Sequence, residues 1–304
     1  MQPIKFKMIF FKLNDFIMER RSFLKTIGVS AISMTVCNEL LTAAPLAKKL
    51  PTIGLIPGNT AGKWLKDHPK EALKKIAEWG YKELEFGGDL GLDMDAAGIT
   101  KYLKSLGLKP LIGSTTMNYM TDEDKLKADI RKSLDLGQKF IVCYWPWTAD
   151  GQGSQIDDWK QVAEKLNKGG AICKKEGIRL LYHNHDIEFR ITEGQIPFDV
   201  LMPLLDPALV GIELDLYWIT KGGQSAVEYI KKYPGRFPVF HVKDMNNETD
   251  RDFACVGSGC IDFASIFKHN STAGAKHFIV EHDRPEDPEA CVASSAKYLT
   301  GLRF

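Results

Sequence analysis

The sequence has almost no excess charge of either sign. Its 40 lysine and arginine residues face 39 aspartate and glutamate residues, a formal net charge of +1. A chain without a strong positive field does not attract nucleic acid through charge, so we expect no nucleic-acid partner. With 304 residues, 44% hydrophobic and 26% charged, the composition is that of a globular protein, and one large domain is the simplest organisation.

Cysteine and long apolar runs are also scarce. The six cysteines are scattered and include no C-x-x-C pair, unlike those of a disulfide-rich scaffold. Cys255 and Cys260 lie close in sequence and are expected to pair if the chain is exported. The apolar run near the N-terminus is too short to span a bilayer. We therefore expect no stable membrane insertion.

The N-terminal segment has the pattern of an export signal. Arg20 and Arg21 precede a mildly apolar run over residues 26–36, and small residues follow at 42–44. Paired arginines followed by Phe-Leu-Lys resemble the twin-arginine signal, which exports folded proteins in bacteria. Glu19 stands where that signal usually has Ser or Thr. The alternative is a basic amphipathic helix of the folded protein.

The export pattern divides the chain into two parts. We assign residues 1–47 to a signal and leader and residues 48–304 to the folded domain. The expected location is the periplasm.

From Pro51 onward, short apolar runs alternate with amphipathic stretches. The amphipathic stretches have apolar residues at helical spacing, and several end in glycine, as at Gly137 and Gly177. Eight runs read as strands: residues 53–56, 83–86, 110–113, 140–144, 179–182, 210–214, 238–241 and 277–280. Eight strand-helix units in about 250 residues are what a closed (β/α)8 barrel, the TIM barrel, requires. The competing open sheet normally has a glycine-rich phosphate loop after its first strand, and residues 57–62 do not match it.

Polar residues follow the ends of these expected strands, where barrel enzymes carry their chemistry. The second strand ends in Glu85 and the sixth in Asp215, and polar runs follow the fifth, seventh and eighth strands at 183–188, 241–244 and 281–283. Four of the seven histidines lie at these ends: His183, His185, His241 and His282. Packing alone does not explain that concentration.

Imidazole and carboxylate groups together favour one divalent cation such as Mn, Zn, Mg or Co. Glu213 and Asp215 point to the same side of their strand, and Asp215, nearer the strand end, is the better ligand. A cation held there would polarise a carbonyl and an adjacent hydroxyl, which lowers the barrier to removing the proton between them. The candidate bases are Glu281, His185, Lys243 and Glu188.

Aromatic side chains are expected near the same strand ends. Each one alone reads as a core residue, but as a set they suit stacking on a sugar ring: Tyr144, Trp145, Trp147, Tyr217 and Trp218. For His282 a hydrogen-bonded structural role is the alternative to a role in binding. We predict substrate contacts from Glu85, Trp145, Trp218 and His282.

Five runs occur in order along the barrel region: residues 182–189, 214–218, 241–244, 257–263 and 280–281. Together they resemble the sugar phosphate isomerase/epimerase group of the xylose-isomerase-like barrel superfamily, over nearly all of residues 51–304. The ordered set is more specific than any single run.

The resemblance implies a metal held from strands five to eight, with Asp215, His241 and Glu281 as ligands. Ketose epimerases of this superfamily have a glutamate on the fifth strand that also serves as one of two acid/base carboxylates. This sequence offers His183 there instead. Glu188 could supply the missing carboxylate, or the reaction differs.

Three functions remain open. The first is a metal-dependent isomerase or epimerase that acts through an enediolate on an unphosphorylated sugar, since phosphorylated sugars are cytoplasmic. The second is a lyase or hydrolase that cleaves keto-glycosides by metal-assisted elimination. The third is a non-catalytic sugar-binding barrel. In each case the expected partner is a small carbohydrate, and homo-oligomerisation is left open.

Overall fold

A closed barrel of eight parallel strands forms the centre of the protein. The computed structural model describes residues 47–146 and 153–304, and Ala47–Phe304 cluster as one unit. The strand order around the barrel is β1-β10-β7-β6-β5-β4-β3-β2, and all eight neighbouring pairs are parallel. The predicted (β/α)8 fold is therefore confirmed. The expected export signal and Trp147 lie outside the described residues.

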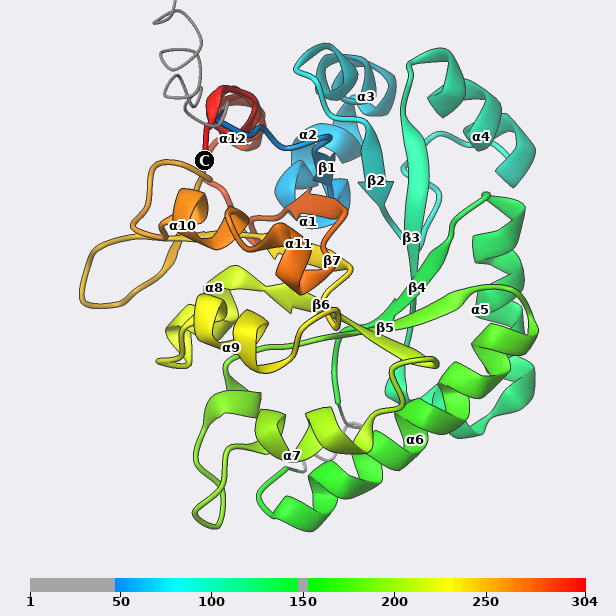
Figure 1. Cartoon of the computed structure of the whole chain (residues 1–304). Helices are drawn as coiled ribbons and strands as arrows, with labels where there is room; N and C mark the ends of the chain where they lie inside the picture. The colour runs from blue at the N-terminus through cyan, green and yellow to red at the C-terminus, as the bar shows by residue number, and fades with distance from the viewer. Residues whose placement is uncertain (1–46, 147–152) are drawn as a thin grey trace, which may run out of the picture. The chain divides into compact units, whose positions relative to one another are not determined.

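Each barrel strand is short and is followed by helical structure that packs outside it, as α4, α5 and α6 do beside β3–β5 (Figure 1). The strands are β1 Gly54–Leu55, β2 Glu83–Glu85, β3 Lys109–Thr115, β4 Phe140–Cys143, β5 Arg179–His183, β6 Val210–Asp215, β7 Val239–Val242, β8 Asp244–Met245, β9 Phe253–Ala254 and β10 His277–Val280. The helices are α1 Pro57–Thr60, α2 Gly62–Asp67, α3 Pro69–Glu78, α4 Ala96–Ser105, α5 Glu123–Asp135, α6 Ile156–Lys175, α7 Pro197–Leu204, α8 Leu216–Lys221, α9 Ala226–Lys232, α10 Phe263–Phe267, α11 Asn270–Ala273 and α12 Pro288–Gly301, with 3-10 turns η1 Met117–Thr121 and η2 Ile187–Phe189.

Local sequence signals explain where these helices start and stop. The carboxylate of Asp287 accepts the backbone N–H of Ala290 and caps the first turn of α12. Gly177 follows α6 with a φ of 87°, a left-handed conformation that a residue with a side chain rarely adopts. In the part of the chain that the structure describes, no helix combines the length and the apolar character needed to cross a membrane.

The barrel interior is layered, because alternate residues of a strand point to the same side. Val142, Leu181, Val239 and Ile279 form a buried apolar layer inside the barrel. The residues two positions further along these strands are polar and lie above that layer at the carboxyl ends. The site therefore rests on a closely packed apolar layer, which limits the movement of its side chains.

The segment after β7 forms a separate feature beside the barrel mouth. There β8 and β9 pair antiparallel, and the buried carboxylate of Asp244 accepts backbone N–H groups of Met245, Gly257, Gly259 and Ile261. Asp244 thus caps this loop, one of the roles considered from the sequence. These hydrogen bonds tie the loop to the end of β7.

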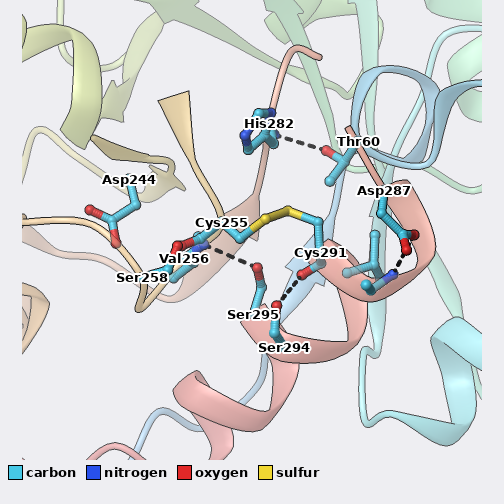
Figure 2. The surroundings of a disulfide bond; sticks show 12 residues. Thr60, Asp244, Cys255, Val256, Ser258, His282, Asp287, Cys291, Ser294 and Ser295 are labelled. Atoms are coloured by element: carbon cyan, nitrogen blue, oxygen red, sulfur yellow. Dashed lines mark hydrogen bonds between the residues drawn. A yellow bond between two sulfur atoms is a disulfide. The ribbon is translucent and has the colours of Figure 1, made fainter. Parts of the chain in front are cut away.

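A disulfide joins this loop to the last helix. It links Cys255 to Cys291 of α12, with a Cα–Cα distance of 5.3 Å (Figure 2). The expected Cys255–Cys260 pairing is therefore wrong, and Cys260 is an exposed free thiol. The reason is that the loop folds back onto α12, a contact across 36 residues of sequence that local spacing does not reveal.

Candidate active site

Four side chains that could hold a metal ion converge at the carboxyl ends of neighbouring strands. They come from β5, β6, β7 and the end of β10, and one ligand atom of each lies within 4.8 Å of the others: His183, Asp215, His241 and Glu281. Oδ2 of Asp215 lies 3.9 Å from Nε2 of His183 and 3.9 Å from Nδ1 of His241. The structure thus brings together all four residues of the predicted metal set, and all are buried.

The donor set fits a divalent cation. Oδ2 of Asp215 is buried and has no hydrogen-bond partner among the described residues, and burial raises the pKa of this carboxyl to about 7. Metal–ligand bonds of about 2.0–2.1 Å would place tetrahedral ligand atoms about 3.3 Å apart, and Nδ1 of His241 and Oε2 of Glu281 are already 3.1 Å apart. Two imidazoles and two carboxylates suit a borderline or hard cation.

Two further carboxylates orient the histidine rings. Nδ1 of His183 lies 3.1 Å from Glu213, and Nε2 of His241 lies 3.0 Å from Glu85. A carboxylate in this position favours a proton on the nitrogen that faces it. The other nitrogen of each ring is directed toward Asp215, at 3.9 Å. Burial would lower the pKa of His241, but the charges of Glu213 and Glu85 raise it well above its ordinary value. A bound cation would release the extra proton.

An open cavity of about 380 Å³ lies over these ligands, within the usual size range for small-molecule sites. It is lined by Ile56, Asn59, Tyr144, Trp145, His183, His185, Trp218, Lys243, Glu281 and Asp283. The lining combines aromatic faces with a few polar groups, as expected for a site that binds a sugar ring.

A buried ammonium group stands beside the ligands. Nζ of Lys243 donates to Oε2 of Glu281 at 2.6 Å and to Oδ1 of Asp283 at 3.0 Å. Burial would lower the pKa of Lys243, but the carboxylates of Glu281, Asp215 and Asp283 raise it above its ordinary value. Lys243 therefore carries a proton at neutral pH. Of the four base candidates it is the one suited to donate.

Another wall of the cavity is aromatic. The ring of His185 stacks on Trp145 with centroids 3.9 Å apart and lies 5.3 Å from the ring of Trp218. Burial lowers the pKa of His185 to about 3, so its imidazole is neutral. Nδ1 of His185 and Nε1 of Trp218 are buried without a hydrogen-bond partner among the described residues. Both nitrogens belong to residues that line the cavity.

Glu188 does not line the cavity, contrary to its assignment as a base. Its carboxylate accepts the hydroxyl of Tyr182 and, at 2.9 Å, the backbone N–H of His185. Tyr182 precedes His183 on β5 and so points to the helix side of the barrel wall. The turn η2 carries Glu188 to that side. We correct its role to support of the loop after β5.

The buried Glu188 should make stability depend on pH. Burial raises the pKa of Glu188 to about 8 from its ordinary 4.5, so its contribution is complete below pH 4.5 and is lost as pH rises toward 8. We expect wild type to lose roughly 3 kcal/mol between pH 5 and pH 8 relative to Glu188→Gln, which stays neutral. Urea unfolding of both proteins at the two pH values measures this difference. Parallel pH profiles would contradict it.

Two of the residues predicted to contact substrate do not line this cavity. Glu85 is completely buried behind His241, with the hydroxyl of Tyr144 at 2.5 Å from its Oε1, so it orients the ligand ring instead of touching substrate. His282 follows Glu281 and points to the opposite side, where it lines a different cavity. Trp145 and Trp218 do line the cavity above the metal ligands.

Two site residues received no role from the sequence. Asn59 in α1 donates to Oε1 of Glu281 at 2.8 Å, and Asp283 accepts from Lys243. Both follow barrel strands, β1 and β10. Polar residues that follow a barrel strand are expected at the site, and this rule applies to both Asn59 and Asp283.

Comparison with known proteins shows the family and fold to which the chain is similar. The family model described as a xylose isomerase-like TIM barrel matches residues 73–302. A sugar phosphate isomerase/epimerase from Parabacteroides distasonis superposes with a TM-score of 0.71 at 27% identity, covering 85% of this chain and 95% of that chain. A structure of the IolI protein with a zinc atom has a TM-score of 0.63 at 18% identity, covering 81% of this chain and 95% of that one.

A curated relative adds a second activity. The inosose dehydratase of Clostridium perfringens is 37% identical over 128 residues, which are 37% of this chain and 42% of that enzyme. The match thus spans less than half of the relative's length. The family model covers most of the barrel, including every strand that carries a metal-ligating residue, and this chain belongs to the xylose isomerase-like TIM barrel family.

Proposed function

We propose that the protein is a metal-dependent lyase that acts on an unphosphorylated keto-sugar or keto-glycoside. The observation that carries the proposal is the convergence of His183, Asp215, His241 and Glu281 under a cavity that also contains the Lys243 ammonium. Such a site can remove a proton next to a carbonyl and protonate a group that leaves from the following carbon.

The four converging side chains would hold the cation. Zinc is supported by the relative whose structure contains it, and Mn, Mg and Co also suit the donors. When bound, a divalent ion supplies Lewis acidity toward a carbonyl and its neighbouring hydroxyl oxygen, worth several kcal/mol.

The chain itself supplies the groups that move protons. His185 lines the cavity with a neutral imidazole, and we assign its ring the role of accepting the substrate proton. Lys243 is protonated and can give its proton to the departing oxygen. Trp145 and Trp218 offer rings for stacking on the sugar. Base and acid thus belong to different walls of one cavity.

The residue at the end of the fifth strand favours elimination over epimerisation. The two-carboxylate epimerases that the sequence resembles have one of their acid/base carboxylates on the fifth strand, but here β5 ends in His183 and Glu188 faces away. The second carboxylate that lines this cavity, Asp283, follows β10 and is paired with Lys243. A curated relative is named inosose dehydratase, and this name also denotes an elimination. The second candidate, isomerisation or epimerisation of a free sugar, is supported by the name of the Parabacteroides relative.

Product analysis separates the two reactions. In the proposed elimination, the proton leaves the carbon next to the carbonyl and the glycosidic oxygen leaves the next carbon along the ring. The glycosidic oxygen is on C1, so the proton must come from C2 and the carbonyl must be at C3. We expect metal-loaded protein to release methanol from methyl 3-keto-glucoside and to form the unsaturated ketone. Interconversion of free ketoses without methanol release would favour the isomerase. Sugar binding that survives Glu281→Gln, with no turnover of any substrate, would indicate a binding protein.

The proposed location is the periplasm. The Cys255–Cys291 disulfide is consistent with an oxidising compartment, and unphosphorylated glycosides are the sugars expected there. Fractionation of cells that express the Arg20→Lys, Arg21→Lys double variant tests this location. Export that continues undiminished would contradict a twin-arginine signal.

A further inference from the structure

We propose that a second cavity beside the metal centre binds the leaving-group ring of a two-ring glycoside. This outer cavity has a volume of about 680 Å³ and lies between the β9 segment and the start of α12. The inference rests on the proposed function, because it assigns the reacting ring to the inner cavity above the metal ligands. It narrows the substrate class from any keto-sugar to glycosides with a substantial leaving group.

The two cavities share one short segment of chain. After β10, Glu281 and Asp283 line the inner cavity, whereas His282 and Arg284 line the outer one. This alternation is the period of two of an extended chain, in which neighbouring side chains point to opposite sides. This segment carries the proposed metal ligand Glu281 and also Asp283, the partner of Lys243. It therefore forms part of the wall of both cavities.

A single aromatic ring links the two sites. Two cationic groups lie 5.2 Å from the centroid of the Phe253 ring: Nζ of Lys243 and the guanidinium carbon of Arg284. The Phe253 ring also lies 5.7 Å from the ring of Trp218. Phe253 thus contacts the proposed proton donor of the inner cavity and a charged residue of the outer one. A leaving group protonated by Lys243 would be next to Phe253, at the border of the outer cavity.

The chemistry of the outer cavity suits a neutral, hydroxyl-rich group. Its charged residues are Arg284, paired to Asp252 at 2.7 and 2.8 Å, and the carboxylates of Glu286 and Asp287. One positive and three negative charges leave an excess of two negative charges, which disfavours a phosphate. Nδ1 of His282 accepts the backbone N–H of Arg284, so the proton of the neutral ring is on Nε2 as a donor. Together with Phe253 these groups resemble a sugar subsite.

The walls of the outer cavity are fixed before any ligand binds. The Cys255–Cys291 disulfide ties the β9 segment to α12, and Thr60 holds the backbone N–H of His282 at 3.0 Å (Figure 2). Donor atoms of Cys255, His282 and Cys291 lie within 4.8 Å of one another, but both sulfurs are bonded to each other. We therefore assign this group to the wall of a ligand site. A preformed site loses little entropy when it binds.

A tryptophan that fills the outer cavity tests the inference. Ala290 on α12 is exposed and lines this cavity only, so Ala290→Trp should block it and leave the inner cavity unchanged. We expect kcat/KM for 3-keto-maltose to fall by about tenfold or more, while kcat/KM for methyl 3-keto-glucoside stays within about twofold. Lys297→Trp, exposed on α12 but outside the cavity lining, is the matched control. Ser294→Trp, which also lines the cavity, is a second blocking variant.

The outcomes separate this inference from the proposed function. Equal losses for both substrates, or no loss for either in both blocking variants, would overturn the outer subsite. If wild type converts neither substrate, the proposed function is wrong, and calorimetric titration of maltose and methyl glucoside then tests the cavity alone. The subsite is supported if the blocking variants bind maltose more weakly than wild type, while their binding of methyl glucoside and the binding of both sugars by the control variant stay unchanged. Unchanged maltose binding overturns it.

Discussion

Replacing Asp215 by asparagine is expected to abolish metal binding and to lower kcat/KM by at least about 10³-fold, because Lewis acidity worth several kcal/mol is lost. The substitution removes the negative charge of the buried carboxylate. Its Oδ2 lies 3.9 Å from Nε2 of His183 and 3.9 Å from Nδ1 of His241. The substitution keeps Oδ1, which accepts the backbone N–H of Trp218 at 2.7 Å and caps α8. Elemental analysis of purified protein, together with the methanol-release assay, measures both effects.

The matched control is another aspartate that caps a helix. Asp262 accepts the backbone N–H of Ser265 at the start of α10 and is exposed, away from the cavity. Asp262→Asn should bind metal and turn over substrate like wild type. If Asp215→Asn retains stoichiometric metal while it unfolds at the wild-type temperature, the four-ligand site is wrong. A loss of metal in both variants would point to a general loss of folding instead.

The convergence of these four side chains could be predicted from sequence because barrel geometry makes strand ends equivalent. Every parallel strand delivers its last inward residue to the same end of the barrel. His183, Asp215 and His241 each end or nearly end a strand, so their meeting requires only the correct strand assignment. Glu281 follows one residue after β10 and obeys the same rule.

Residues beyond the strand ends were harder to predict, for two different reasons. His282 is one position past Glu281, and alternation places it on the other side, as its place in the outer cavity shows. The period of two of an extended chain predicts this side. Glu188 depends on a 3-10 turn that carries the chain out of the strand direction, and no periodic pattern predicts its side. The partner of Cys255 was hidden because the contact joins a loop to a helix much later in the chain.

Replacing Lys243 by methionine is expected to lower kcat by about 10²–10⁴-fold while metal binding is retained. Methionine fills much of the same apolar volume but offers no proton to a leaving oxygen. The substitution removes a positive charge 2.6 Å from Oε2 of Glu281 and 3.7 Å from Oδ2 of Asp215. The carboxylates then attract a cation at least as strongly as before. Elemental analysis should therefore find full metal in a nearly inactive protein, the reverse of the combination expected for Asp215→Asn.

Two additional measurements distinguish proton donation from a structural role. Lys221→Met is the control, because Nζ of Lys221 also lies over the Trp218 ring, at 5.8 Å, but does not line the cavity. It should keep wild-type kcat. A glycoside whose leaving group is an acidic phenol needs no proton to depart, so Lys243→Met should cleave it at nearly the wild-type rate while it fails on the methyl glycoside. Equal losses on both substrates would show that Lys243 positions the ligands and does not donate the proton.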